Sequence, residues 1–167
     1  MDLITEPKAP GDQPAVDASA PVVVSTAIDV MAPADVVWDV LADIEWWPAW
    51  NRAVRSVSVD GDVAPGTEFE WKAGPGTIHS TLLQVVRPTF IAWSGHTLGL
   101  RAIHVFALRT DGEHTTVRTE ESYSGPVARL LRGPIRRSLA RALANGLVDL
   151  KAQAERRARC ADDAACT

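Results

Sequence analysis

The 167-residue chain has little cysteine, no long apolar run and no excess of positive charge. Its two cysteines, Cys160 and Cys166, lie in the last eight residues without metal-ligand spacing, so they neither cross-link a core nor bind zinc. This usage favours a reducing, cytoplasmic setting. No stretch reaches the roughly 18 apolar residues of a membrane-spanning helix, and no basic segment precedes an apolar one at the N-terminus. We therefore expect neither a membrane span nor a secretory signal.

Charge and motifs limit the possible partners and cofactors. The 17 basic and 21 acidic residues give a net charge of −4, which argues against nucleic acid as a partner. The sequence contains neither a nucleophile elbow nor a phosphate-binding loop. Its four histidines form no metal-ligand pattern. We expect no metal and no cofactor.

The remaining composition is that of a globular protein with one domain. Apolar residues make up 46% of the chain and charged residues 23%. Residues 1–21 contain four prolines among small and acidic residues, which predicts a disordered tail. We expect one folded domain over residues 22–158 and a second disordered tail over residues 159–167.

Apolar periodicity predicts an α+β fold. Period-two runs predict strands over residues 22–30, 54–59, 67–72, 77–86, 90–94, 100–110 and 113–124. Helical spacing predicts a helix over residues 34–42, a short helix or turn within 44–51, and one or two turns over 127–132. A long helix then runs from Pro134 to about residue 158, a length of roughly 36 Å. About seven antiparallel strands would thus wrap around one long C-terminal helix.

The two strands within residues 100–125 form the most informative hairpin. Asp111-Gly112 is a strong turn signal, and pairing Thr110 with Glu113 sets the register. The face expected to point inward carries Ala102, His104, Phe106, Leu108, Thr115, Val117, Thr119 and Glu121. In this register His104 lies opposite Thr119, and Glu121 is its diagonal neighbour. The inner face thus combines apolar residues with a histidine and a glutamate.

One helix cannot fill the concave face of such a sheet, so we expect a cavity between the sheet and the helix. The alternation of apolar and polar residues places the side chains that line this cavity on the inner faces of the strands. One residue of the helix lies opposite them. The predicted ligand-binding residues are Phe69, Trp71, Ile78, Leu82, Ile91, Trp93, Phe106, Val117 and Leu143. An apolar cavity with few polar groups is the usual form of a small-molecule site.

Several segments resemble the START-like, or SRPBCC, superfamily, and its polyketide cyclase/dehydrase branch in particular. They are APADVVWDVLADIEWWPAWN (residues 32–51), VVRPTFIAW (85–93), HVFAL (104–108), EESYSG (120–125) and LKAQAE (150–155). The resemblance covers residues 22–158. It implies the helix-grip fold, with a deep hydrophobic cavity between the sheet and the C-terminal helix. Relatives include aromatase/cyclases, ligand-binding proteins, lipid-transfer domains and heat-shock ATPase activators.

Three functions are compatible with these features. The first is binding of a polyketide-, lipid- or aromatic-like molecule, with His104 and Glu121 as polar contacts. The second is a cofactor-free cyclase, aromatase or dehydratase, a lyase or isomerase in which His104 is the general base and Glu121 orients it. The third is a protein-interaction module with an exposed apolar patch around Trp46, Trp47 and Trp50, which we otherwise interpret as packing residues. His104 and Glu121 could also form a purely structural pair.

Residues 129–141 form a basic segment in a net-acidic chain. They contain five arginines and no acid, namely Arg129, Arg132, Arg136, Arg137 and Arg141. One interpretation is a solvated helix face. The other is a docking site for an acidic acyl carrier protein or for phosphate.

Overall fold

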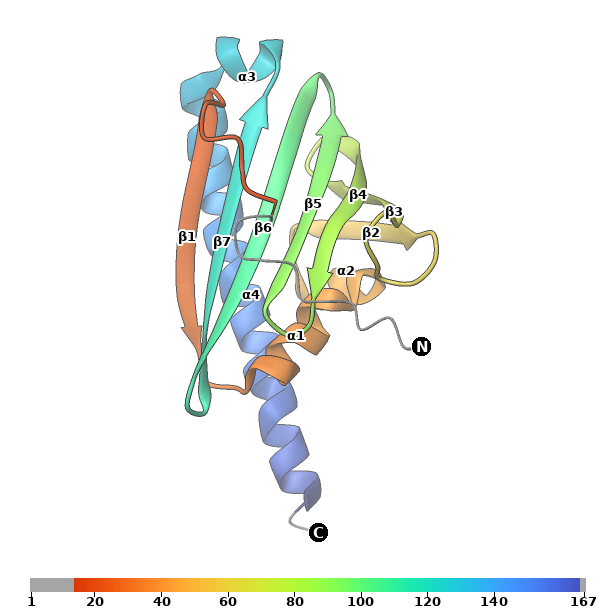
Figure 1. The fold of residues 1–167 in the computed structure, drawn as a ribbon, viewed down its shortest axis with the longest axis vertical. Coiled ribbons are helices and arrows are strands. Elements are labelled where there is room, and N and C mark those ends of the chain that lie inside the picture. Colours follow the sequence, from red (N-terminus) through yellow and green to blue (C-terminus); the bar gives the residue numbers. More distant parts are fainter. Residues whose placement is uncertain (1–13, 166–167) are drawn as a thin grey trace, which may run out of the picture.

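The computed structural model describes the backbone of residues 14–165 and the side chains of residues 14–161 (Figure 1). The predicted tail residues 1–13 and Cys166 lie outside the described residues. The elements are β1 (Val22–Val30), α1 (Ala34–Ala42), the 3-10 helix η2 (Ile44–Trp46), α2 (Trp47–Trp50), β2 (Val54–Val59), β3 (Glu68–Ala73), β4 (Gly76–Val86), β5 (Phe90–Thr97), β6 (Leu100–Asp111), β7 (His114–Ser124), α3 (Pro126–Leu130) and α4 (Arg132–Ala165).

The strands form one antiparallel sheet in the order β1-β7-β6-β5-β4-β3-β2. The long helix α4 crosses one face of this curved sheet, and α1 and α2 lie beside it (Figure 1). Buried residues of α1, including Val37 and Leu41, share a core with Leu147 and Leu150 of α4. The predicted α+β helix-grip architecture is therefore confirmed.

The β6–β7 hairpin turns one residue later than predicted. Asp111 pairs with His114, so the turn residues are Gly112 and Glu113. Gly112 has a φ of 64°, a conformation that glycine adopts without a steric penalty. β6 is one residue longer than expected and β7 begins one residue later, so the pairing shifts by two residues. A shift by two retains the predicted inner and outer faces. His104 now lies directly opposite Glu121 rather than diagonal to it.

Both ends of the domain are more ordered than the sequence suggested. Asp17 begins a turn that closes with Ala20, and its backbone N–H donates to Ser122 Oγ at 3.1 Å. This segment lies on the face of the sheet opposite α4 (Figure 1). At the other end, α4 begins at Arg132 and continues to Ala165, since residues 158–165 hold four alanines and no helix breaker. In the described part of the chain, no helix is long and apolar enough to cross a membrane.

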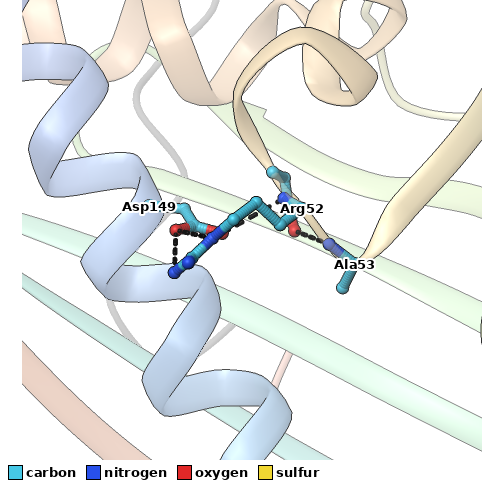
Figure 2. A network of polar contacts seen from close by, with 4 residues as sticks. Arg52, Ala53 and Asp149 are labelled. Atoms are coloured by element: carbon cyan, nitrogen blue, oxygen red, sulfur yellow. Dashed lines mark hydrogen bonds and ion pairs between the residues drawn. The ribbon is translucent and has the colours of Figure 1, made fainter.

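A polar clasp joins α4 to the loop between α2 and β2 (Figure 2). Asp149 accepts hydrogen bonds from the backbone N–H of Arg52 at 3.1 Å and from its Nε at 2.9 Å, and Arg52 Nη2 lies 2.8 Å from the same carboxylate. Hydrogen bonding to Asp149 and its negative charge raise the pKa of Arg52. Ala53 N–H donates to Asn51 Oδ1, which orders the loop itself. The clasp therefore fixes the chain leading from α2 into β2 against the helix.

We predict that Asp149→Ala lowers the melting temperature by roughly 3–6 °C, because it removes a buried acceptor of three interactions. Asp39→Ala is the matched control, since Asp39 pairs with Arg87 at an exposed site. Its effect should stay below about 2 °C. Thermal denaturation followed by circular dichroism measures both shifts. Equal shifts in melting temperature would show that the clasp contributes no more stability than an exposed ion pair.

Candidate ligand-binding cavity

A cavity of about 460 Å³ lies between the sheet and α4. Its sheet wall comes from β3 to β7, and its opposite wall is the segment of α4 from Ile135 to Leu150. The α1–β2 region, with Leu41, Trp47 and Trp50, forms a further wall. Most of the lining side chains are apolar. The volume lies within the roughly 300–1,000 Å³ range of small-molecule pockets.

The structure brings together some of the predicted lining residues and buries the others. Trp71, Ile78, Trp93, Phe106 and Leu143 line the cavity, as do His104 and Glu121. Four predicted residues do not line it, namely Phe69, Leu82, Ile91 and Val117. They belong to the closed core with α1, and each is at most 2% exposed. Alternation identifies the inner face of a strand, but it gives no information on how far along the strand the core ends and the cavity begins.

Trp47 is the most important lining residue that the sequence-based prediction missed. Its ring packs edge-on against the ring of Trp71, with 5.6 Å between the ring centroids. The centroid of the Trp93 ring lies 5.5 Å away. Its Nε1–H donates to the backbone carbonyl of Leu41 at 2.9 Å. Trp47 therefore packs in the core, as predicted, and also lines the cavity together with Trp50. The sequence does contain a signal for this pair, because Trp47 and Trp50 are three residues apart and residues at this spacing share one face of a helix.

Four side chains form a polar cluster on the sheet wall, which we call the polar ledge: His104, Thr119, Glu121 and Tyr123. His104 Nε2 lies 2.7 Å from Thr119 Oγ1, and its Nδ1 lies 3.5 Å from Glu121 Oε2. Among the described residues Nδ1 has no hydrogen-bond partner. The centroid of the His104 ring lies 4.6 Å from that of the Trp93 ring and 4.7 Å from that of the Phe106 ring. A histidine with one free nitrogen thus stands between two aromatic rings.

Burial determines the charge state of the ledge. It lowers the pKa of His104 to about 3 and raises the pKa of Glu121 to about 8, an effect that hydrogen bonding with Tyr123 partly opposes. Burial, then the charge of Glu121 and the hydrogen bond to it, raise the pKa of Tyr123. At neutral pH the histidine is therefore uncharged and the glutamate is protonated. This differs from the charge state that favours a general base, because a neutral Glu121 does not stabilise a protonated His104.

The cavity reaches the surface at one end of the sheet. The exposed residues that bound this mouth are Gly74 and Pro75 between β3 and β4, Leu98 between β5 and β6, and Ser138 and Ala142 on α4. The two turns pack closely, because a Cβ atom at Gly76 would lie 2.8 Å from Thr97 Oγ1. Thr97 Oγ1 donates to the Thr77 carbonyl at 2.8 Å, which joins the turns further.

Two other histidines of the sheet, His79 and His96, lie on its outer face. His79 Nδ1 lies 2.8 Å from Glu70 Oε1, and the His79 ring stacks on His96 at 5.2 Å. Neither lines the cavity between the sheet and α4. Within residues 14–161, histidine, cysteine and acidic side chains form no group of three or more that could hold a metal ion.

A seven-stranded sheet around a C-terminal helix, with an apolar cavity between them, defines a START-like helix-grip protein. The profile of the family "Polyketide cyclase / dehydrase and lipid transport" matches residues 21–155. The chain belongs to this family, whose fold binds hydrophobic ligands. No curated protein sequence matches the chain significantly.

Solved structures share the fold at low sequence identity. The Zhui aromatase/cyclase from Streptomyces sp. R1128 has a TM-score of 0.71 and 21% identity, over 83% of this chain and 96% of that chain. A hypothetical protein from Helicobacter pylori has a TM-score of 0.73 and 16% identity, over 82% and 90%. A START superfamily protein from Mycobacterium smegmatis has a TM-score of 0.57 and 17% identity, over 82% and 97%. At these identities the similarity establishes the fold alone.

The buried state of Glu121 makes stability depend on pH. Unfolded Glu121 ionises near its ordinary pKa of 4.5, whereas the folded protein keeps the proton to about pH 8. Wild-type stability therefore falls as pH rises between these values, with a slope approaching about 1.4 kcal/mol per pH unit. We predict that Glu121→Gln removes this decline between pH 7 and 8, where unfolded His104, with an ordinary pKa of 6.5, is mostly uncharged.

Urea denaturation at several pH values measures this effect, with Glu120→Gln as the control on the same strand. Glu120 faces outward and contacts Arg118, so its substitution should leave the slope unchanged. A wild-type slope that persists in Glu121→Gln would show that Glu121 is ionised in the folded protein.

Proposed function

We propose that this protein binds a polyketide-, lipid- or aromatic-like molecule in the cavity and holds one of its polar atoms on the polar ledge. The observation that carries the proposal is an apolar cavity of about 460 Å³ whose lining groups His104, Glu121 and Tyr123 at one wall. Apolar walls supply affinity, and a few convergent polar groups orient the ligand. A cytoplasmic location stays a prediction from the sequence.

The charge state of the ledge favours a neutral, oxygen-bearing ligand. A protonated Glu121 donates a hydrogen bond, and a ketone or phenol oxygen accepts one without bringing charge into an apolar chamber. The aromatic walls add a preference for planar rings, because Trp47, Trp71 and Trp93 can stack on or meet the edge of such a ligand. A ring system that carries a carbonyl or hydroxyl group satisfies both requirements.

A second candidate function is a cofactor-free cyclase, aromatase or dehydratase. The similarity to an aromatase/cyclase fold and the His104–Glu121 pair support it. Proton removal next to a carbonyl needs a base, and a neutral His104 has a free Nδ1 for that step. Its lowered pKa makes it a weak base in the empty cavity, so protonated Glu121 is better suited to act as an acid. The expected partner of such an enzyme is an acyl carrier protein at the exposed arginines of α3 and α4.

The protein-interaction module is the least supported candidate. It requires an exposed apolar patch around residues 46–50 and a small or closed cavity. Trp46 is 52% exposed, but Trp47 and Trp50 line the cavity. One exposed tryptophan beside an open cavity supports ligand binding better than docking of a protein at this site.

Filling the cavity from the helix tests the binding proposal. Gly146 lines the cavity, and a Cβ there would meet only Asn51 Nδ2, at 4.0 Å. We predict that Gly146→Leu weakens binding of an aromatic ketone probe at least tenfold without lowering the melting temperature, since leucine also favours the helix. Ala144→Leu, at an exposed position of α4 that does not line the cavity, is the matched control. Quenching of tryptophan fluorescence measures the affinity, and equal affinities of both variants would contradict the proposal.

Substitutions on the ledge separate binding from catalysis. For a binding protein, we predict that His104→Ala and Glu121→Ala each weaken the affinity for the aromatic ketone probe about five- to tenfold, since each removes one polar contact. For an enzyme, the same variants keep their affinity for a poly-β-ketone substrate but lose its cyclisation. Native mass spectrometry measures binding, and absorbance of the cyclised product measures turnover. Retained affinity with lost turnover would contradict the binding proposal and support the cyclase function.

A further inference from the structure

Three leucines are exposed at the end of the molecule where the cavity opens. Leu98 is 66% exposed, Leu130 is 84% exposed and Leu131 is 47% exposed. Leu98 lies between β5 and β6, whereas Leu130 is the last residue of α3 and Leu131 connects α3 to α4. The two segments are adjacent, since a Cβ at Gly99 would lie 3.3 Å from Val127 of α3 (Figure 1). Together they form an apolar patch beside the mouth.

Leu98 occupies its exposed position at a conformational cost. Its φ is 44°, and it is the one residue other than glycine with positive φ among the described residues. Gly99 follows with a φ of 76°, so the two-residue turn has the form that asparagine or aspartate followed by glycine adopts with least strain. A leucine there costs stability and gains no burial. Strain of this kind is typical of functional positions.

The same end of the protein is basic, although the whole chain has a net charge of −4. The strand ends and turns near the mouth, residues 71–78, 95–104 and 122–142, contain no aspartate or glutamate. They carry exposed cationic side chains at Lys72, Arg101, Arg129, Arg132, Arg136, Arg137 and Arg141. Arg55 adds another, because its guanidinium donates to the Gly74 carbonyl at 2.5 Å. Of the residues that the structure describes, the one acid placed beside Leu98 and Arg101 is Asp17. The leucines thus project from a surface on which cations outnumber acids.

We propose that this end of the protein, the rim surface of Leu98, Leu130, Leu131 and the surrounding arginines, docks on an anionic lipid bilayer. The inference rests on the proposed ligand-binding function, because the docked mouth would pass a hydrophobic ligand between bilayer and cavity without exposure to water. Charge complementarity orients the protein, since its acidic remainder is repelled by the same membrane. The leucines insert among the lipid headgroups while the arginines contact them.

A bilayer fits this surface better than an acidic carrier protein does. The leucines protrude from two separate segments, and the hollow that Leu98 shares with Asp17 and Arg101 includes neither Leu130 nor Leu131. A fluid lipid surface accommodates protruding apolar side chains without requiring a matching shape. The cavity opens between Leu98 and the first turns of α4, beside this patch, so a ligand dissolved in the bilayer would meet the mouth directly.

Flotation with lipid vesicles tests this proposal. We expect the full chain to bind phosphatidylcholine vesicles that contain about 30% phosphatidylglycerol, and not vesicles of pure phosphatidylcholine; binding should weaken in high salt. The double variant Arg136→Gln with Arg137→Gln should lose about 25-fold in affinity, since each cation near such a surface contributes about fivefold. Arg109→Gln with Arg118→Gln, at the hairpin end of β6 and β7, is the matched control and should bind normally.

The leucines are tested in the same assay. Leu130→Ser should weaken vesicle binding at least fivefold, whereas Met31→Ser, at an exposed apolar residue after β1, should not. Leu98→Asn should weaken vesicle binding and raise the melting temperature by about 2–4 °C, because asparagine suits the turn. A role in stability alone would not give these opposite changes.

Three results would overturn the proposal. They are equal affinity for neutral and anionic vesicles, equal losses in the rim and control variants, and binding to an acyl carrier protein without binding to vesicles. Affinity for the aromatic ketone probe should stay normal in Leu130→Ser and in the Arg136–Arg137 variant, because these residues do not line the cavity. Probe binding without vesicle binding would reject the membrane inference alone, and absence of probe binding would reject the proposed function.

Discussion

One long helix has to cover the concave face of seven strands, and the rest of the structure depends on this mismatch in size. Near the middle of α4, α1 and Trp47 fill the remaining space, and a closed core forms around Phe69, Leu82 and Ile91. Toward the start of α4 the short helix α3 does not line the space between helix and sheet, which stays open as the cavity. The same strands therefore serve as core at one end and as cavity wall at the other.

The polar ledge follows from this geometry. His104 and Glu121 are directly paired on β6 and β7, and both face the apolar side of the sheet. Removal from water disfavours the charged form of each group, so the pair is most stable with both partners neutral. A carboxyl group that stays protonated at neutral pH is a hydrogen-bond donor, which changes the kind of ligand atom that it selects.

Much of the fold and part of the site could be predicted from the sequence. Period-two alternation gave the inner faces of β3 to β7. These assignments survived an error in the hairpin turn because the pairing shifted by two residues, which leaves each side chain on the same face. The point along each strand at which the core ends and the cavity begins could not be predicted. The burial of Phe69 or Val117 depends on where α1 and Trp47 pack. The raised pKa of Glu121 could not be predicted either, because it results from burial by residues that are distant in the sequence.

The small residues on the inner side of α4 have a consequence for how this site can change. Ala142 and Gly146 leave space opposite the sheet, whereas the hydrogen-bonding groups stand on β6 and β7. Ligand size is thus determined by the helix and ligand chemistry by the sheet. Because the two walls belong to different elements, single substitutions can alter one property and leave the other intact. A scaffold divided in this way can acquire new ligands without rebuilding its polar contacts.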